Sequence, residues 1–290
     1  MPPRKPSPVG GHVFVGAGLL APGSAGGLGY AREVGAEAVQ LFVSNPRAWA
    51  PATGDPARDE AFRTACAQAR IRVFVHAPYL VNFASPTEAT RRRSVQSVRA
   101  AVARGARLGA LGVVVHAGSA VSGGREPALR LLRESLLPLL DALTPEDPML
   151  LVEPMAGGGQ PLAGTVDELA SYFAALDHHP RLGVCLDTCH AFAAGHDLAA
   201  PGGVRATLSA LVKAVGRGRL RLVHANDSKD PVGSGRDRHA SIGAGRIGVD
   251  PFAELFRHPA TRDVPVIVET PGKAADHARD IAVLKSLRDR

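Results

Sequence analysis

Cysteine is scarce in this 290-residue chain: Cys66, Cys185 and Cys189 are the only three, and no two of them form a CxxC pair. An odd number of separated cysteines argues against a disulfide framework and favours a reducing compartment. The expected location is therefore cytoplasmic.

Long apolar runs are lacking as well. No segment reaches the roughly 18 apolar residues that a membrane span requires. The opening MPPRKPSPVGG is basic and rich in proline, without the apolar centre of a signal peptide. We expect no association with a membrane, and we expect residues 1–11 to form a flexible tail.

Acidic residues are outnumbered: 27 Asp and Glu stand against 34 Lys and Arg, which gives a formal net charge of +7. A basic chain favours an anionic partner such as a nucleic acid, although an arginine-rich composition alone can produce the same balance. With 45% hydrophobic residues the chain can bury a full core without disulfides or a structural metal.

Short apolar or β-branched runs recur along the chain, and segments with helical periodicity separate them. These runs predict eight strands, at residues 12–15, 38–43, 72–76, 112–116, 149–153, 182–187, 220–224 and 265–269. Because the strands are continuously apolar and alternate with helices, they indicate a parallel sheet covered by helices. Eight repeats predict an α/β fold of the (β/α)8 TIM barrel type, a single domain over residues 12–290; an open doubly wound sheet is the alternative.

The predicted strand ends carry chemistry. His, Asp and Glu are 38 of the 290 residues, so chance would place one of them at only about one of the eight ends. Six ends carry one: His76, His116, Glu153, Asp187, His224 and Glu269. Strand ends of a barrel meet at its carboxyl-terminal face, so we expect these side chains to surround a common point.

Two further segments extend this set. In CLDTCH, His190 follows Asp187 by three residues, so a helical turn starting there would direct both into one cavity. In GSGRDRH, alternation directs Asp237 and His239 to one side of an extended segment and Arg236 and Arg238 to the other. The arginines could contact phosphates or form a supporting ion pair; taken alone, the segment could also be a solvated glycine loop.

Imidazole and carboxylate ligands suit zinc, with manganese or iron as alternatives. Nine candidate ligands exceed the needs of one ion and predict a cluster of two or three. Paired ions are typical of phosphodiester hydrolysis, because they activate a water and stabilise both the attacking and the leaving oxygen.

Two loops predicted at the same face carry aromatic and basic side chains. SNPRAW offers Arg47 and Trp49, and HAPYLVN offers Tyr79 and Leu80. Inserted into a duplex, such side chains would help to unstack a nucleotide. Trp49 could instead cap the apolar edge of the barrel.

HAPYLVN, CLDTCHAFAAGHDL and HANDSKDPVGSGRDRHASIGAGRIG strongly resemble motifs of the endonuclease IV family, and the resemblance runs from about residue 12 to the C-terminus. It implies a zinc-dependent (β/α)8 deoxyribonuclease of DNA repair whose partner is double-stranded DNA containing abasic sites. Such an enzyme cleaves on the 5′ side of the abasic site, leaving a 3′-hydroxyl and a 5′-deoxyribose phosphate, and also trims blocked 3′ ends.

The resemblance also implies three zinc ions, with manganese possible at one site. It places the first with His76, His116 and Glu153, the second with Asp187, His224 and Glu269, and the third with His190, Asp237 and His239. Glu153 would bridge the first two and act as the catalytic residue that organises the attacking water. Arg47, Tyr79 and Leu80 would enter the DNA.

The chain departs from the family after Glu153, where Pro154 and Met155 replace a common Asn-Thr pair. Hydrogen bonds around metal-bound carboxylates influence the reaction rate and the affinity for the metal, so we expect this change to affect both.

Two other functions fit parts of the pattern. A metal-dependent sugar isomerase or epimerase of a related barrel would use one or two ions, but it explains neither the third ligand set nor the charge. A catalytically silent DNA-binding protein would keep the metals for structure alone. We expect a monomer.

Overall fold

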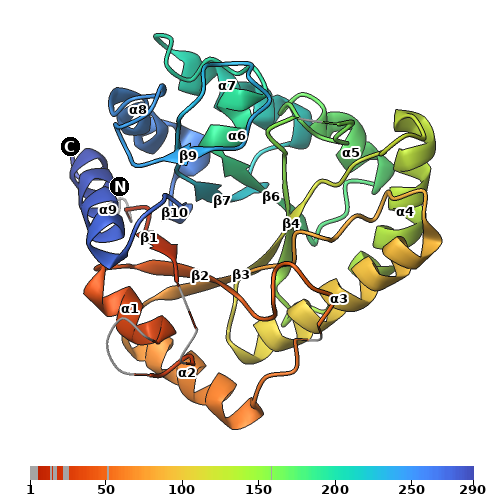
Figure 1. Ribbon diagram of the computed structural model, residues 1–290, viewed down its shortest axis with the longest axis horizontal. Helices are drawn as coiled ribbons and strands as arrows, with labels where there is room; N and C mark the ends of the chain where they lie inside the picture. The colour runs from red at the N-terminus through yellow and green to blue at the C-terminus, as the bar shows by residue number, and fades with distance from the viewer. Residues whose placement is uncertain (1–5, 14, 16–17, 22–25, 51, 158) are drawn as a thin grey trace.

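The structure is a computed structural model that describes residues 6–13, 15, 18–21, 26–50, 52–157 and 159–290. Within these residues eight parallel strands close into a barrel in the order β1-β10-β7-β6-β5-β4-β3-β2 (Figure 1). The strands are β1 (Val9–His12), β2 (Ala38–Phe42), β3 (Arg72–His76), β4 (Gly112–His116), β5 (Met149–Glu153), β6 (Leu182–Asp187), β7 (Leu220–His224) and β10 (Val266–Val268). The predicted (β/α)8 barrel is confirmed, and the open sheet is not formed.

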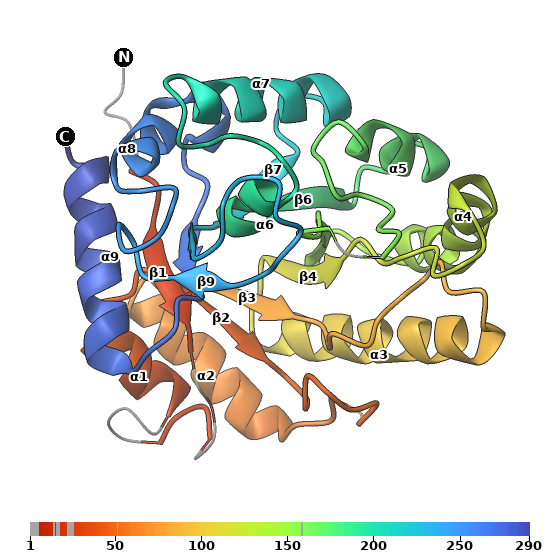
Figure 2. The same ribbon diagram turned by 45° about the horizontal axis from the view of Figure 1, so that its top comes forward.

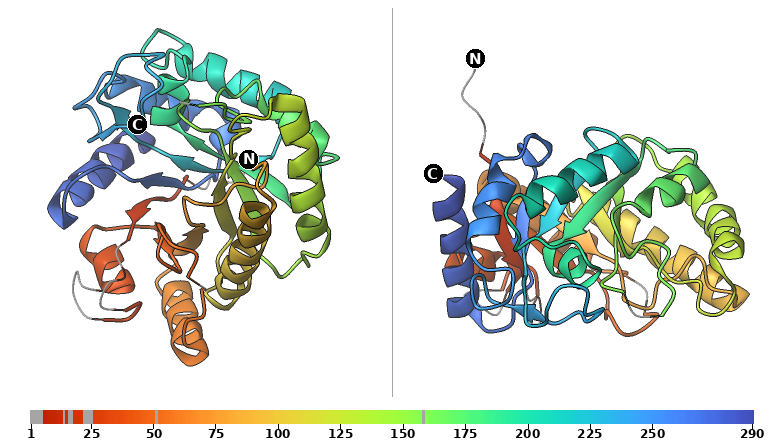
Figure 3. Two further views of the ribbon diagram at one scale, coloured as in Figure 1. Left: turned by 45° about the vertical axis from the view of Figure 1, so that its right-hand side comes forward. Right: turned by 90° about the horizontal axis from the view of Figure 1, so that it is seen from above.

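Helices surround the barrel, as Figures 1 and 3 show. They are α1 (Gly27–Glu33), α2 (Pro56–Gln68), α3 (Glu88–Arg107), α4 (Arg125–Asp141), α5 (Leu169–Ala175), α6 (Thr188–Ala193), α7 (Gly203–Val215), α8 (Asp250–Arg257) and α9 (Ala274–Arg288), with a 3-10 turn at η2 (Pro259–Thr261). On α3, Val98, Ala101, Val102 and Gly105 are buried at spacings of three and four residues, so one face packs on the strands. None of the helices in the described ranges is long and apolar enough to cross a membrane.

The first strand begins earlier than predicted. β1 spans Val9–His12 rather than residues 12–15, and Val9 pairs with Val266 of β10. Ser7 and Val9 are buried, so the prediction of a flexible tail through residue 11 is wrong for this part; residues 1–5 lie outside the described residues. The strand was not recognised in the sequence because two of its four residues are glycine. A Cβ at Gly10 would lie 1.6 Å from the Ala38 carbonyl oxygen, so the close approach of β1 to β2 requires glycine there.

The barrel interior contains a small apolar cluster, separate from the main core between strands and helices. It is formed by one side chain from each of seven strands: Ala38, Phe74, Val114, Leu151, Cys185, Leu222 and Ile267. Because side chains alternate along a strand, the residue two positions further on points into the same interior. These residues are Gln40, His76, His116, Glu153, Asp187, His224 and Glu269. Along each of these seven strands, the side chain inside the barrel thus changes from apolar to polar over two residues, toward the carboxyl-terminal mouth.

A short antiparallel pair, β8 (Asp227–Ser228) and β9 (His239–Ala240), carries the GSGRDRH segment over this mouth (Figure 2). The segment is tied to α6: the N–H groups of Gly233 and Gly235 donate to the carbonyls of Phe192 and Ala193 at 3.0 and 2.9 Å. Both glycines have positive φ values of 72° and 63°, a conformation that other residues rarely adopt. The glycines therefore let the segment fold over the strand ends.

Candidate metal centre

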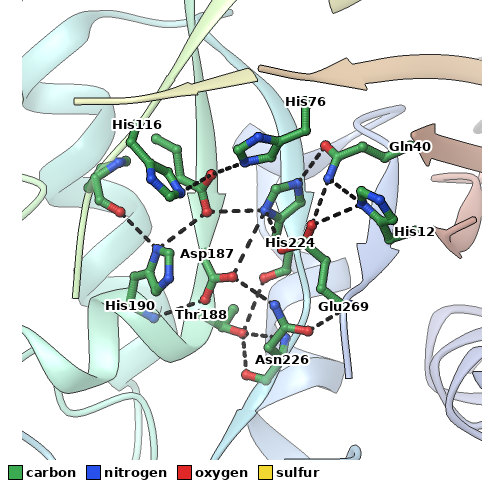
Figure 4. A network of polar contacts seen from close by, with 12 residues as sticks. His12, Gln40, His76, His116, Asp187, Thr188, His190, His224, Asn226 and Glu269 are labelled. Atoms are coloured by element: carbon green, nitrogen blue, oxygen red, sulfur yellow. Dashed lines mark hydrogen bonds and ion pairs between the residues drawn. The ribbon is translucent and has the colours of Figure 1, made fainter. Parts of the chain in front are cut away.

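Glu153, the last residue of β5, lies at the centre of the mouth and is 1% exposed. Its Oε2 is 3.3 Å from His76 Nε2 and 3.7 Å from His116 Nε2. Its Oε1 is 3.1 Å from His224 Nδ1 and 3.3 Å from His190 Nδ1. One buried carboxylate is therefore shared by four histidines from four different elements, all four visible in Figure 4.

A second group surrounds His224 at the end of β7. Its Nδ1 lies 3.2 Å from Glu269 Oε2 and 3.9 Å from Asp187 Oδ2. Asn226 fastens both acids: its Nδ2 donates to Asp187 Oδ2 at 2.7 Å, and its Oδ1 accepts the Glu269 N–H at 2.8 Å. Potential ligand atoms of Glu153, Asp187, His224 and Glu269 all lie within 4.8 Å of one another.

A third group joins α6 to the GSGRDRH segment. Asp187 caps α6 by accepting the His190 N–H at 2.9 Å, so the predicted helical turn is present. Asp237 lies between two imidazoles, with Oδ2 3.2 Å from His190 Nε2 and Oδ1 3.0 Å from His239 Nε2. Cys189 Sγ also lies within 4.8 Å of ligand atoms of Asp237 and His239, and burial raises the pKa of this thiol to about 12. The nine residues selected from the sequence are thus brought together.

The histidines have the second contacts typical of metal ligands. His76 Nδ1 donates to the Ala77 carbonyl at 2.6 Å, His190 Nδ1 to the Pro154 carbonyl at 3.0 Å and His239 Nδ1 to the Glu269 carbonyl at 3.1 Å. The opposite ring nitrogen of each faces a carboxylate. Metal-bound histidines are normally oriented in this way, so the donor set fits divalent cations such as zinc. His239 Nε2 is buried and forms no well-directed hydrogen bond among the described residues, although Asp237 Oδ1 lies 3.0 Å away, as expected of a nitrogen that faces an ion.

The ionisable groups of this centre have displaced pKa values. Burial alone would raise the pKa of Glu153, but His224, His190 and His76 outweigh it and hold the pKa well below the usual range. Burial lowers the pKa of His116 to about 4, which keeps that imidazole neutral. Displaced pKa values in neighbouring groups are typical of functional sites.

The arrangement also bears on the Pro154 and Met155 departure. His190 is held by the Pro154 main-chain carbonyl, and proline supplies this acceptor as well as any other residue does. The orientation of His190 is therefore independent of the side chain at position 154.

The two aromatic loops meet at the rim of the mouth, where the Tyr79 N–H donates to the Pro46 carbonyl at 2.9 Å. Tyr79 is 49% exposed and Leu80 38% exposed, and Arg47 is exposed as well. The Tyr79 ring stacks on His116 with a centroid distance of 5.7 Å and an interplanar angle of 20°. These three residues lie where a molecule approaching the metal centre would meet them.

The remaining candidates for DNA contact are placed differently. Trp49 is only partly exposed and packs against the main core, which favours its alternative role as a cap on the apolar edge. Arg238 Nε donates to Asp230 Oδ2 at 2.6 Å, and Arg236 Nη1 lies 3.6 Å from Asp230 Oδ1. Both arginines turn away from the metal ligands, as alternation predicted, and the supporting ion pair is present.

A cavity of about 1530 Å³ opens beside the centre, lined in part by His12, Phe42, Tyr79, His239 and Glu269. Its volume exceeds that of a typical small-molecule pocket. Sequence reasoning missed three polar residues at the barrel mouth: His12, Gln40 and Asn226. The one signal for Gln40 was its position as the only polar residue within the apolar run AVQLFV.

Comparisons with known proteins agree with the geometry. The sequence model of the family described as xylose isomerase-like TIM barrel matches residues 28–287. A probable endonuclease 4 from Streptomyces coelicolor is 58% identical over 285 residues, which cover 98% of this chain and 96% of that protein. A probable endonuclease 4 from Chloroflexus aurantiacus is 36% identical over 282 residues, 96% of this chain and 97% of that protein.

Solved structures extend the comparison. Endonuclease IV from Thermus thermophilus superposes with a TM-score of 0.82 at 34% identity, covering 99% of each chain. A D-tagatose 3-epimerase-like protein superposes with a TM-score of 0.74 at 19% identity, covering 97% of each chain. The second likeness concerns the barrel fold alone.

Proposed function

Because this chain belongs to the endonuclease IV family, within the xylose isomerase-like TIM barrels, we propose that it is a DNA repair endonuclease acting at abasic sites in double-stranded DNA. It hydrolyses the phosphodiester bond on the 5′ side of the lesion, leaving a 3′-hydroxyl and a 5′-deoxyribose phosphate, and it trims blocked 3′ ends. The observation that carries this proposal is the convergence of five histidines and four acids at the barrel mouth, with Glu153 shared by four of the histidines.

Three zinc ions fit this donor set, with manganese as the alternative occupant of one site. His76, His116 and Glu153 would hold the first; Asp187, His224 and Glu269 the second, with Glu153 bridging; and His190, Asp237 and His239 the third. The contacts among these residues support the assignment, since potential ligand atoms of the first group lie within 4.8 Å of one another, as do those of the second with Glu153. When bound, the ions supply Lewis-acid activation of a water and stabilise negative charge on the reacting oxygens.

The protein's own groups provide charge and position. The lowered pKa of Glu153 keeps it ionised at neutral pH, and its two oxygens face different histidine pairs. A carboxylate so placed can orient a water between the first two metal sites. Asn226 and the main-chain carbonyls around the histidines keep the surrounding groups in place, so little reorganisation is needed during the reaction.

Substrate binding would use the rim and the overall charge. Arg47, Tyr79 and Leu80 are exposed beside the centre and can enter a duplex at the lesion, where a sugar without a base has less stacking to lose. The net charge of +7 favours contacts to backbone phosphates, so binding should weaken steeply as salt increases.

The test is an incision assay on a duplex that contains one abasic-site analogue, with a matched intact duplex as the control. Zinc-loaded protein should cut only the analogue-containing strand, on the 5′ side, and a chelator should stop the reaction. Elemental analysis of the native protein should find three ions per chain. Chelator-sensitive epimerisation of a ketose without any incision would replace the proposal by the sugar isomerase alternative. Binding of the duplex without either reaction would favour a silent DNA-binding protein.

A further inference from the structure

Gln40 lies inside the barrel on β2 and is fully buried. It lies two residues beyond Ala38, the β2 member of the inner apolar cluster. In the other six strands that contribute to this cluster, the residue at the same position is a proposed metal ligand. Five of these strands end at that residue, and β10 is directly followed by it. A neutral amide is a weak ligand for zinc. The contacts of this amide, rather than ligation, indicate what it does.

Its oxygen determines which nitrogen of His224 carries a proton. Gln40 Oε1 lies 2.9 Å from His224 Nε2, and an amide oxygen can only accept a hydrogen bond. His224 Nε2 must therefore donate, which in the neutral ring leaves the lone pair on Nδ1. This Nδ1 is the atom that faces Glu153 and Glu269.

Its nitrogen orients Glu269. Gln40 Nε2 donates to Glu269 Oε1 at 2.7 Å, and its second hydrogen can reach His12 Nδ1 at 3.1 Å (Figure 4). With Oε1 engaged, the other oxygen of Glu269 remains 3.2 Å from His224 Nδ1. One amide thus orients two groups, and both converge on the same point.

Three of the other four histidines are held differently. Main-chain carbonyls of Ala77, Pro154 and Glu269 accept from His76, His190 and His239, and no substitution removes a carbonyl. His224 depends on a side chain. The second metal site therefore contains a histidine that can be released by changing a residue that is not itself a ligand.

We propose that Gln40 is a positioning residue of the second metal site: by holding His224 with Nδ1 free and Glu269 with Oε2 free, it sets the affinity of that site for zinc. The inference rests on the ligand assignment of the proposed function. Loss of such outer contacts typically lowers metal affinity by about 10- to 100-fold.

The experiment compares Gln40→Met, which keeps the length of the side chain and removes its hydrogen bonds to His224, Glu269 and His12, with the wild type. Zinc-loaded proteins are dialysed against increasing concentrations of a chelator, and retained zinc is measured by elemental analysis. We expect Gln40→Met to lose one ion of three at a chelator concentration about 10- to 100-fold below that needed for the wild type, with the other two retained equally. Thr261→Val is the control, because it removes a buried hydroxyl that donates to Leu255 and His258, away from the mouth; it should retain all three ions.

A second measurement uses the wild type and does not depend on the variant folding. Nitrogen-15 NMR of the zinc-loaded protein should show the His224 ring protonated at Nε2, with Nδ1 shifted by the metal. Protonation at Nδ1, or equal retention of three ions in Gln40→Met and wild type, would overturn the inference. Because neither readout involves DNA, its failure is distinct from that of the proposed function, which falls if loaded wild type does not cut the abasic duplex.

Discussion

The inside of this barrel has two contrasting regions built by the same strands. The inner apolar cluster is buried and contains no charged side chain. Two residues further along the same strands, the side chains are polar and contact one another. On β5 the pair is Leu151 and Glu153; on β7 it is Leu222 and His224. Buried charges cost stability unless they are paired, so the contrast teaches that the cluster stabilises the barrel while the mouth is arranged for chemistry.

The strongest test of this contrast is the central carboxylate of the mouth. Glu153→Gln keeps the shape and removes the charge shared by four histidines. Cleavage of the abasic duplex should fall by about 10⁴-fold or more, as for other residues that act as part of one catalytic unit. The measurement is single-turnover incision together with duplex binding, which should be largely retained. Glu134→Gln, at an exposed position on α4, should cut at the wild-type rate.

The complementary change is made in the cluster. Leu222 is fully buried, so Leu222→Ala should lower the free energy of unfolding by about 2–5 kcal/mol, by lost burial and the cavity left behind. Denaturant unfolding measures this loss, and the folded fraction should still cut DNA. Leu111→Ala provides the matched control, since Leu111 is 53% exposed and its truncation should change stability by no more than about 0.5 kcal/mol. Comparable losses of unfolding free energy in the two variants would contradict the idea that the inner apolar cluster stabilises the barrel more than an exposed leucine does.

At the rim, substrate binding and stability should separate. Tyr79→Ala removes a ring that is 49% exposed and stacked on His116, so the protein should remain stable. If the ring stacks on DNA, affinity for the abasic duplex should fall by about 1–3 kcal/mol. Fluorescence titration and incision at saturating enzyme distinguish weaker binding from slower chemistry. Unchanged affinity would assign Tyr79 to the packing of His116 alone.

The smallest effect concerns an ion pair at the start of the barrel, away from the mouth. Burial alone would raise the pKa of Glu37, but the Val9 N–H, Arg288 and Lys285 outweigh it and lower the pKa below its ordinary value of 4.5. A carboxyl with a lowered pKa stabilises the fold above the pKa of the unfolded chain, and this contribution is lost as the pH falls through the folded value. Glu37→Gln should therefore be less stable than the wild type at pH 7, by at most about 1 kcal/mol for such a partly exposed pair, and equally stable at acidic pH. Thermal unfolding of both proteins across a range of pH measures this difference in stability. A difference that does not change with pH would contradict the stabilising role of the ionised Glu37 carboxylate.

Prediction from the sequence succeeded for residues whose place follows from a local pattern, such as the last residue of a predicted strand. Parallel strands of a barrel end at one face, so His76, His116 and Asp187 could be placed together from the strand ends alone. It failed at β1 because Val9–His12 contains two glycines and no apolar run. The glycine that hides this strand is the one that its packing against Ala38 requires.

The sequence by itself determined the barrel and the identity of the nine candidate ligands. It also indicated that Asp237 and His239 point to one side of their segment and Arg236 and Arg238 to the other. These follow from periodicity and from strand ends, which are local properties. Only the tertiary structure decided that Arg236 and Arg238 pair with Asp230, that Trp49 packs on the core, and that Gln40 joins His224 to Glu269. The physical reason is distance along the chain: Gln40 and His224 are 184 residues apart, and a hydrogen bond between them exists only once the barrel has closed.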